Sequence, residues 1–192
     1  MKLFKIFAGI MGFFALVFVV SLFFPRTYKI EKTTVINMPD HETFAYLNNI
    51  RNWADWSPWN TDLDSSMVFF LSKVTEGKGA AQYFRGGLVG NGRFRIVESN
   101  PNESIAYSLY IDMGEGSFMS ISQKFVLKSL GGKTQLTWVD EGDVGMNPLY
   151  RFLLPSKIKS TEQGFEEGLA VIKKSAENRK LQMMQPLLQK LD

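Results

Sequence analysis

The chemistry that this chain can perform is limited by a single histidine and a complete lack of cysteine. His41 stands between Asp40 and Glu42, where a helix is expected to begin, so we expect it at the surface. Without a second histidine or a thiolate, the chain lacks the side chains for a zinc cluster, a Cys–His pair or a Ser-His-Asp triad around a cavity histidine. The sequence therefore predicts no metal site and no cofactor.

General acid–base chemistry would have to use a carboxylate or a tyrosine. The available residues in the central part of the chain are Tyr83, Glu98, Tyr107, Tyr110, Asp112 and Glu141. Their spacing marks none of them as the partner of another. Catalytic residues are therefore left unassigned, and the sequence favours a binding protein over an enzyme.

Two local motifs have both a chemical and a structural interpretation. Asp62 and Asp64 lack the further oxygen ligands and the glycine of a calcium loop, so we expect a solvated loop there. The glycine-rich run from Gly86 to Gly92 matches neither of the common nucleotide-binding glycine motifs. A hairpin turn is expected instead.

The elements that must position these side chains follow from the apolar pattern and its breaks. A β-rich run from Tyr28 to Met38 ends at Pro39-Asp40, where a short helix begins. A second short helix is expected within 51–59, and six strands of an antiparallel meander fit between 67 and 141. A long amphipathic helix is expected from about Ser156 to Lys180, so residues 28–180 read as one α+β domain.

Two glycines interrupt the expected long helix on or near its apolar face. Gly164 and Gly168 each cost about 1 kcal/mol of helix propensity relative to alanine. Two compensations are open: close approach of the sheet to the helix backbone, or room for a ligand.

The start of the chain carries a long apolar segment without charge, from Ile6 to Phe24. As a helix it would extend roughly 28 Å, close to the roughly 30 Å of hydrocarbon in a bilayer. We expect an uncleaved anchor at 6–24, preceded by a basic tail at 1–5 and followed by a linker at 25–27; a cleaved signal peptide is the alternative. Lys2, Lys5 and the amino terminus on one side are balanced by Arg26, Lys29 and Lys32 on the other, so the positive-inside rule nearly cancels. The short basic tail still resembles that of an uncleaved signal-anchor, which favours a domain on the outer side of the membrane.

The net charge and the C-terminal tail indicate which binding partners can be expected. The net charge of +3, from 22 basic and 19 acidic residues, is too small and too mixed for a nucleic-acid surface. Residues 181–192 have apolar side chains at helical spacing, interrupted by Pro186, which should kink or end a helix. This tail could contact the membrane surface or a membrane-protein partner, and a frayed terminus is the alternative.

Four local sequences resemble one known family. They are Val35-Ile36-Asn37-Met38-Pro39 followed by Phe44, Trp53-Ala54-Asp55-Trp56-Ser57-Pro58-Trp59, Thr134-Gln135-Leu136-Thr137-Trp138 and Phe165-Glu166-Glu167-Gly168-Leu169. Over roughly residues 28–178 the chain resembles the SRPBCC superfamily, with its START-like helix-grip fold, and in particular its polyketide cyclase/dehydrase-type branch. The resemblance implies a curved, seven-stranded antiparallel sheet wrapped around the long C-terminal helix. An anchor before such a domain resembles bacterial members, which implies a single-pass protein of the bacterial inner membrane; the outer side favoured by the basic tail would then be the periplasm.

The resemblance also implies a hydrophobic cavity, and with it an apolar ligand such as a lipid, a polyketide or an isoprenoid. Expected cavity-lining residues are Phe69, Tyr83, Phe94, Tyr107, Phe125, Trp138, Phe165 and Leu169, which could equally form a filled core. Trp53, Trp56 and Trp59 are expected to plug one end of the sheet or to form the rim of the cavity entrance. Because members of this fold differ in function, a cyclase-, dehydrase- or hydrolase-type enzyme and a membrane accessory protein remain alternatives.

Overall fold

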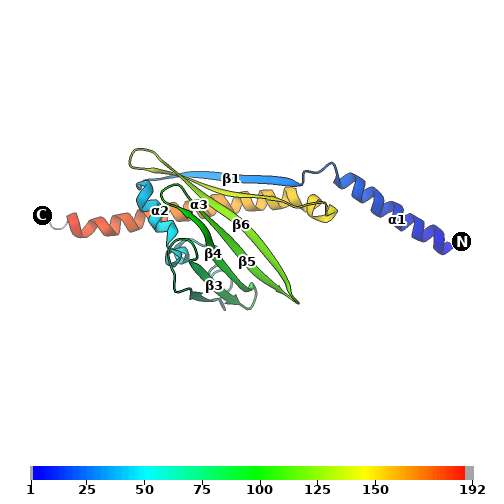
Figure 1. Ribbon diagram of the computed structural model, residues 1–192, viewed down its shortest axis with the longest axis horizontal. Coiled ribbons are helices and arrows are strands. Elements are labelled where there is room, and N and C mark those ends of the chain that lie inside the picture. The colour runs from blue at the N-terminus through cyan, green and yellow to red at the C-terminus, as the bar shows by residue number, and fades with distance from the viewer. Residues whose placement is uncertain (1, 189–192) are drawn as a thin grey trace. The chain divides into compact units, whose positions relative to one another are not determined.

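The computed structural model describes residues 2–188 of the chain. Helix α1 (Lys2–Ser21) is followed by strand β1 (Thr27–Ile36), helix α2 (Asp40–Asn48) and the 3-10 helix η1 (Ile50–Asp55). The remaining elements are β2 (Val68–Leu71), β3 (Ala81–Gly86), β4 (Gly90–Asn100), β5 (Ser104–Gly114), β6 (Ser117–Ser129), β7 (Thr134–Asp143) and α3 (Pro148–Leu188) (Figure 1). The order of elements expected from the sequence is confirmed.

The seven strands form one sheet in the order β1-β7-β6-β5-β4-β3-β2. From β2 to β7 each strand pairs antiparallel with the next along the chain. Short turns join the strands from β3 to β7, and residues 72–80 join β2 to β3. The turn between β3 and β4 is closed by the pair Gly86 and Gly90, which confirms the expected hairpin. The α+β helix-grip architecture, an antiparallel sheet followed by a long C-terminal helix, is thus present.

Two compact units divide the described chain. One joins the chain up to Ile30 with Glu141–Gln163, and the other joins Glu31–Asp140 with the chain from Gly164 onward. The second unit holds most of the sheet and its core, whose fully buried members include Ile36, Leu47, Ile50, Trp53, Ile96, Ile105, Phe125, Leu136 and Ile172. The expected domain limits at residues 28 and 180 stay a prediction.

Helix α3 begins earlier and ends later than the sequence pattern indicated. It starts at Pro148, whose fixed φ suits the first helical position, and Asn147 Oδ1 accepts the backbone N–H of Leu149 at 3.0 Å. At the other end it continues through Pro186 to Leu188, so the helix does not end at this proline, which was one of the two outcomes expected there. Residues 189–192 of the expected tail lie outside the described residues.

Helix α1 belongs to the first unit. Its segment Phe4–Ser21 is long and apolar enough to cross a membrane, judged by length and composition. Unlike the core helix of a soluble protein, it leaves nearly all of its side chains exposed. A signal sequence would have the same length and composition, so α1 suits an anchor without deciding against a signal.

Candidate functional site

Aromatic rings line the inward face of the sheet in the second unit. The structure brings together six of the eight expected residues, all at most 5% exposed: Phe94, Tyr107, Phe125 and Trp138 on β4 to β7, and Phe165 and Leu169 on α3. Because side chains alternate along a strand, one ring per strand points inward at this level of the sheet. The centroids of neighbouring rings lie 6.4, 5.5 and 5.0 Å apart from β4 across to β7. Whether this cluster encloses a ligand stays a prediction.

Helix α3 approaches the sheet most closely at Trp138. The indole stacks on the ring of Phe165, with centroids 4.4 Å apart and planes 9° apart. A Cβ added at Gly168 would lie 2.6 Å from Cζ3 of Trp138, whereas a Cβ added at Gly164 would have no neighbour within 4 Å. Gly168 therefore allows close packing, and Gly164 leaves open space beside the helix.

A small polar group lies within this aromatic interior. Gln123 Oε1 accepts hydrogen bonds from the Tyr107 hydroxyl at 2.5 Å and from Trp138 Nε1 at 3.2 Å. Asp140, which is 2% exposed, pairs with Gln123 in the register of β6 and β7. Burial raises the pKa of Tyr107 well above its ordinary value, the hydrogen bond with Trp138 opposes that rise, and the Asp140 charge adds to it. Tyr107 is therefore a neutral hydrogen-bond donor at physiological pH.

Trp53 and Trp59 pack against aromatic rings of the sheet, including that of Phe94. Trp53 is fully buried, and its Nε1 donates to the carbonyl of Leu47 at 2.8 Å. Trp59 is half-buried, with its ring centroid 5.2 Å from that of Phe84. The one hydrogen-bond donor of the Trp53 side chain is thus used inside the fold. A role for Trp59 at a cavity entrance stays a prediction.

Trp56 differs because its polar atom has no partner. The side chain is buried against Phe125 and Trp138, with ring centroids 5.7 and 5.8 Å away. Among the buried side-chain nitrogen and oxygen atoms of the described residues, Nε1 of Trp56 is the one without a hydrogen-bond partner. Trp56 also lines a recess of about 220 Å³ between the loop after η1 and helix α3, together with Asp55, Ser57, Pro58, Asn60, Gly164, Glu167, Gly168 and Val171. Trp56 therefore combines an unused, buried donor with a side chain that borders open space.

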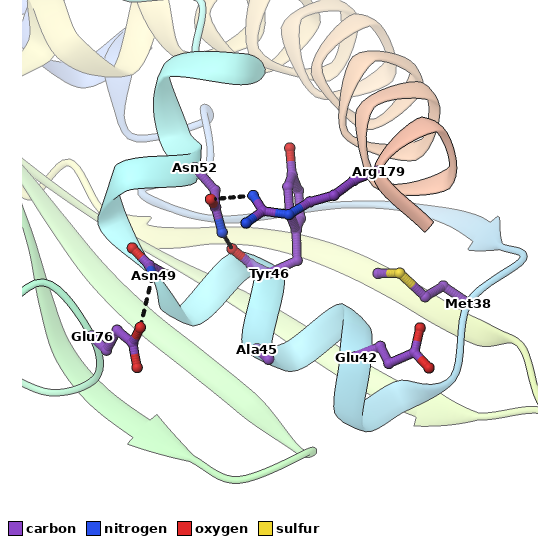
Figure 2. Close-up of a pocket in the computed structure, with 8 residues that line it drawn as sticks. All are labelled: Met38, Glu42, Ala45, Tyr46, Asn49, Asn52, Glu76 and Arg179. Atoms are coloured by element: carbon purple, nitrogen blue, oxygen red, sulfur yellow. Dashed lines mark hydrogen bonds between the residues drawn. The ribbon is translucent and has the colours of Figure 1, made fainter. Parts of the chain in front are cut away.

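A second recess, of about 350 Å³, lies near the end of α3 and is shown in Figure 2. Arg179 donates to Asn52 Oδ1, and Asn52 Nδ2 donates to the carbonyl of Tyr46 at 2.8 Å. The guanidinium carbon of Arg179 lies 5.7 Å from the centroid of the Tyr46 ring, within the range of a cation–π contact. Burial and the charge of Asp55 raise the pKa of Tyr46. Since these polar groups already bind one another, we assign them to holding α3 against α2 and η1.

Of the other two expected cavity residues, one points away from the interior and one lies at its edge. Tyr83 is 43% exposed and points away from the interior, so its expected position in a cavity wall is wrong. Its neighbour Phe84 points inward instead, because Phe84 pairs with Gly92, and a Cβ at Gly92 would collide with the Phe84 ring. Phe69 pairs with Phe84 on the short edge strand β2, where it is only half-buried.

The residues proposed for acid–base chemistry are mostly outside. Glu98, Asp112 and Glu141 are exposed and Tyr110 is half-buried, which leaves Tyr107 as the one of the six in the interior. Sequence reasoning missed Gln123 and Asp140. For Asp140 a signal was present, since Leu136, Trp138 and Asp140 alternate along one strand and must share a face.

The loop with Asp64 is ordered by hydrogen bonds, so the expectation of a solvated loop is wrong at this residue. Asp64 Oδ1 accepts from the Ser66 backbone N–H and hydroxyl, and Oδ2 accepts from Leu88 and Val89 N–H at 2.8 and 3.2 Å. The Ser66 hydroxyl and these backbone donors lower the pKa of Asp64 to about 2. Its role is to fix the β3–β4 turn. Within residues 2–188, no group of three or more His, Cys, Asp or Glu side chains is placed to hold a metal ion.

Comparison with known families shows to which protein family the chain belongs. Residues 27–177 match the family model described as polyketide cyclase / dehydrase and lipid transport. The chain belongs to this family. The expected resemblance to a polyketide cyclase/dehydrase branch is thereby confirmed. No curated protein matches the chain significantly in sequence.

Solved structures similar to this member of the family share its fold at low sequence identity. The Aha1 dimer from Colwellia psychrerythraea is 15% identical with a TM-score of 0.54, over 78% of this chain and 96% of that one. CalU16 from Micromonospora echinospora is 12% identical with a TM-score of 0.51, over 83% of each chain. Ara h 8.0201 is 13% identical with a TM-score of 0.52, over 81% and 99%. Identities this low establish a common architecture and nothing about ligands.

Proposed function

We propose that this protein is a membrane-anchored binding protein that holds an apolar small molecule, such as a lipid, a polyketide or an isoprenoid-like compound, inside its helix-grip domain. The observation that carries the proposal is the unpartnered indole N–H of Trp56, buried among aromatic rings beside an open recess. Binding sites for small molecules typically combine apolar walls with a few polar groups. The description of the family, which includes lipid transport, supports the same conclusion.

The energetics of Trp56 favour a bound molecule. A buried donor without a partner costs about 1–3 kcal/mol. A ligand oxygen that reached Nε1 would remove this cost, while the apolar part of the ligand lay against the rings of Trp56 and Trp138. The recess is also lined by Asp55 and Glu167, whose charges would repel an anion. A neutral ligand with an acceptor oxygen is therefore the best fit.

A cyclase-, dehydrase- or hydrolase-type reaction would need a group that moves a proton to or from the ligand. Of the six residues considered for this role, Tyr107 is the one in the interior, and its raised pKa keeps it protonated, so it cannot serve as a base at neutral pH. Asp140 is also buried there, but neither Tyr107 nor Asp140 lines the recess beside Trp56. We therefore propose binding rather than catalysis.

Anchoring by α1 is the second part of the proposal. Its exposed apolar side chains would be covered by lipid. Basic residues flank both ends of the apolar run, so the proposed cytoplasmic N-terminus and periplasmic domain in the bacterial inner membrane rest on the likeness of the short basic tail, with Lys2 and Lys5, to that of an uncleaved signal-anchor.

Native mass spectrometry of the full-length protein, released from membranes in lipid nanodiscs, tests the binding proposal. We expect a co-purifying neutral apolar mass, and we expect added farnesol or methyl oleate to compete with it. Trp56→Phe keeps a ring but removes the N–H, and should weaken binding about tenfold, since a hydrogen bond contributes about 1–1.5 kcal/mol. Trp59→Phe is the matched control and should bind normally. A protein that carries no ligand and takes up neither probe would contradict the proposal, and normal binding by Trp56→Phe would contradict the role of the indole.

A further inference from the structure

The end of α1 and the beginning of α3 are joined by direct contacts within the first unit. Arg151 on α3 is buried, with 5% of its surface exposed. One of its terminal nitrogens donates a hydrogen bond to the carbonyl of Ser21 at 3.3 Å, and its Nε donates one to the carbonyl of Gly145 at 2.9 Å. The rings of Phe24 and Phe152 meet edge to face, with centroids 4.8 Å apart. A guanidinium at the last carbonyls of α1 is also favoured by the helix dipole. These contacts hold the first turns of α3 beside the point where α1 ends.

Around this junction the surface is apolar. Five large apolar side chains are between 52% and 86% exposed, and we call them the junction patch: Phe23, Met146, Leu149, Tyr150 and Leu153. In a water-soluble surface helix such positions are mostly polar. Here they follow directly on the exposed apolar surface of α1.

We propose that the junction patch inserts into the headgroup region of the lipid bilayer in which α1 is anchored. This inference rests on the proposed anchoring. The bilayer is the occupant favoured by continuity: the contacts of Arg151 and Phe152 keep the patch at the end of α1, which is where a membrane-spanning helix leaves the hydrocarbon. Amphipathic helices bury their apolar side about 5–10 Å into the headgroup boundary, and tyrosine is enriched at that depth.

Site-specific fluorescence on the full-length protein in liposomes tests the proposal. The chain has no cysteine, so a single Cys can carry an environment-sensitive NBD label at any chosen site. Leu149→Cys probes the junction patch, and Leu88→Cys, an exposed leucine in the β3–β4 turn, is the matched control. Phe13→Cys, in the middle of α1, reports on the anchor independently. We expect the label at 149 to be quenched at least roughly twofold more than that at 88 by lipids with a nitroxide near the headgroup.

The three labels separate failure of the patch from failure of the anchor. If the label at 13 is in lipid while those at 149 and 88 are equally exposed to water, the anchor stands and the patch proposal is overturned. If the label at 149 is shielded from water but is not quenched by nitroxide lipids, a protein surface covers the patch, and the proposal is again overturned. Water exposure at 13 and 149 together would remove both proposals. Tyr150→Cys repeats the measurement in the same turn should Leu149→Cys fold poorly.

Discussion

Replacing Gly168 with alanine tests whether the close approach of α3 to the sheet limits the stability of the domain. Alanine gains about 1 kcal/mol of helix propensity over glycine. At Gly168, however, the new Cβ would lie 2.6 Å from Cζ3 and 3.3 Å from Cη2 of Trp138, so the indole would have to shift from its stack on Phe165. Overpacking of this kind costs about 1–3 kcal/mol. The net expectation is a free energy of unfolding lowered by up to about 2 kcal/mol.

Gly164→Ala is the matched control, since it makes the same change one turn earlier where no heavy atom lies within 4 Å of the new Cβ. It should raise the free energy of unfolding by about 1 kcal/mol. The two variants should therefore differ by about 1–3 kcal/mol. For a chain of 192 residues this corresponds to at least about 2 °C in Tm. Urea and thermal unfolding of the full-length protein in detergent, followed by tryptophan fluorescence, measures both.

The cause of the difference can be isolated at Trp138. Trp138→Phe removes Cζ3 and Cη2, so in that background the difference between Gly168→Ala and Gly164→Ala should shrink toward zero. Equal stability of the two alanine variants in the wild-type background would refute this reasoning. A difference that persists without the indole would refute it as well.

Three further outcomes are expected. The pKa of Asp64 is lowered from 3.8 to about 2, so its contribution to stability is complete above about pH 4 and is lost as the pH falls toward 2. Asp64→Asn should remove this part of the acid dependence of the urea midpoint, whereas Asp62→Asn should retain it. Gln123→Leu leaves two buried donors without an acceptor and should cost about 1–3 kcal/mol more in urea unfolding than Tyr107→Phe; equal costs would contradict the shared acceptor. Arg151→Met removes donors to two backbone carbonyls, so hydrogen exchange at the start of α3 should accelerate while β3 to β6 stay protected; unchanged exchange would contradict its role at the junction.

The sequence predicted the order of the elements because apolar periodicity and turn residues are local signals. The family resemblance also suggested Phe94, Tyr107, Phe125 and Trp138, which the structure places on the inward face of β4 to β7. The prediction failed at Tyr83 because two aromatic residues are adjacent in β3 and alternation alone fits either one. The choice is made by the pairing of Phe84 with Gly92, where the missing side chain makes room for the ring.

Other features depend on contacts between residues far apart in the chain. The carboxylate of Asp64 accepts hydrogen bonds from the backbone N–H groups of Leu88 and Val89, and no local sequence pattern near Asp64 predicts these contacts. The unpartnered nitrogen of Trp56 likewise depends on which rings surround it after folding. The start of α3 is a different case: Asn147-Pro148 is a readable capping signal, and the sequence interpretation placed the helix start too late.

The amide of Gln123 presents a hydrogen-bond donor, and no free acceptor, to the interior. Its oxygen is occupied by Tyr107 and Trp138, so its remaining polar atom is a nitrogen that can only donate. Trp56 Nε1 is also a donor, and it lacks a hydrogen-bond partner. These two nitrogens thus offer hydrogen atoms rather than lone pairs. They would favour carbonyl, ether or ester oxygens, and a molecule with one such end could be held in a single orientation, with its hydrocarbon part directed away from these donors.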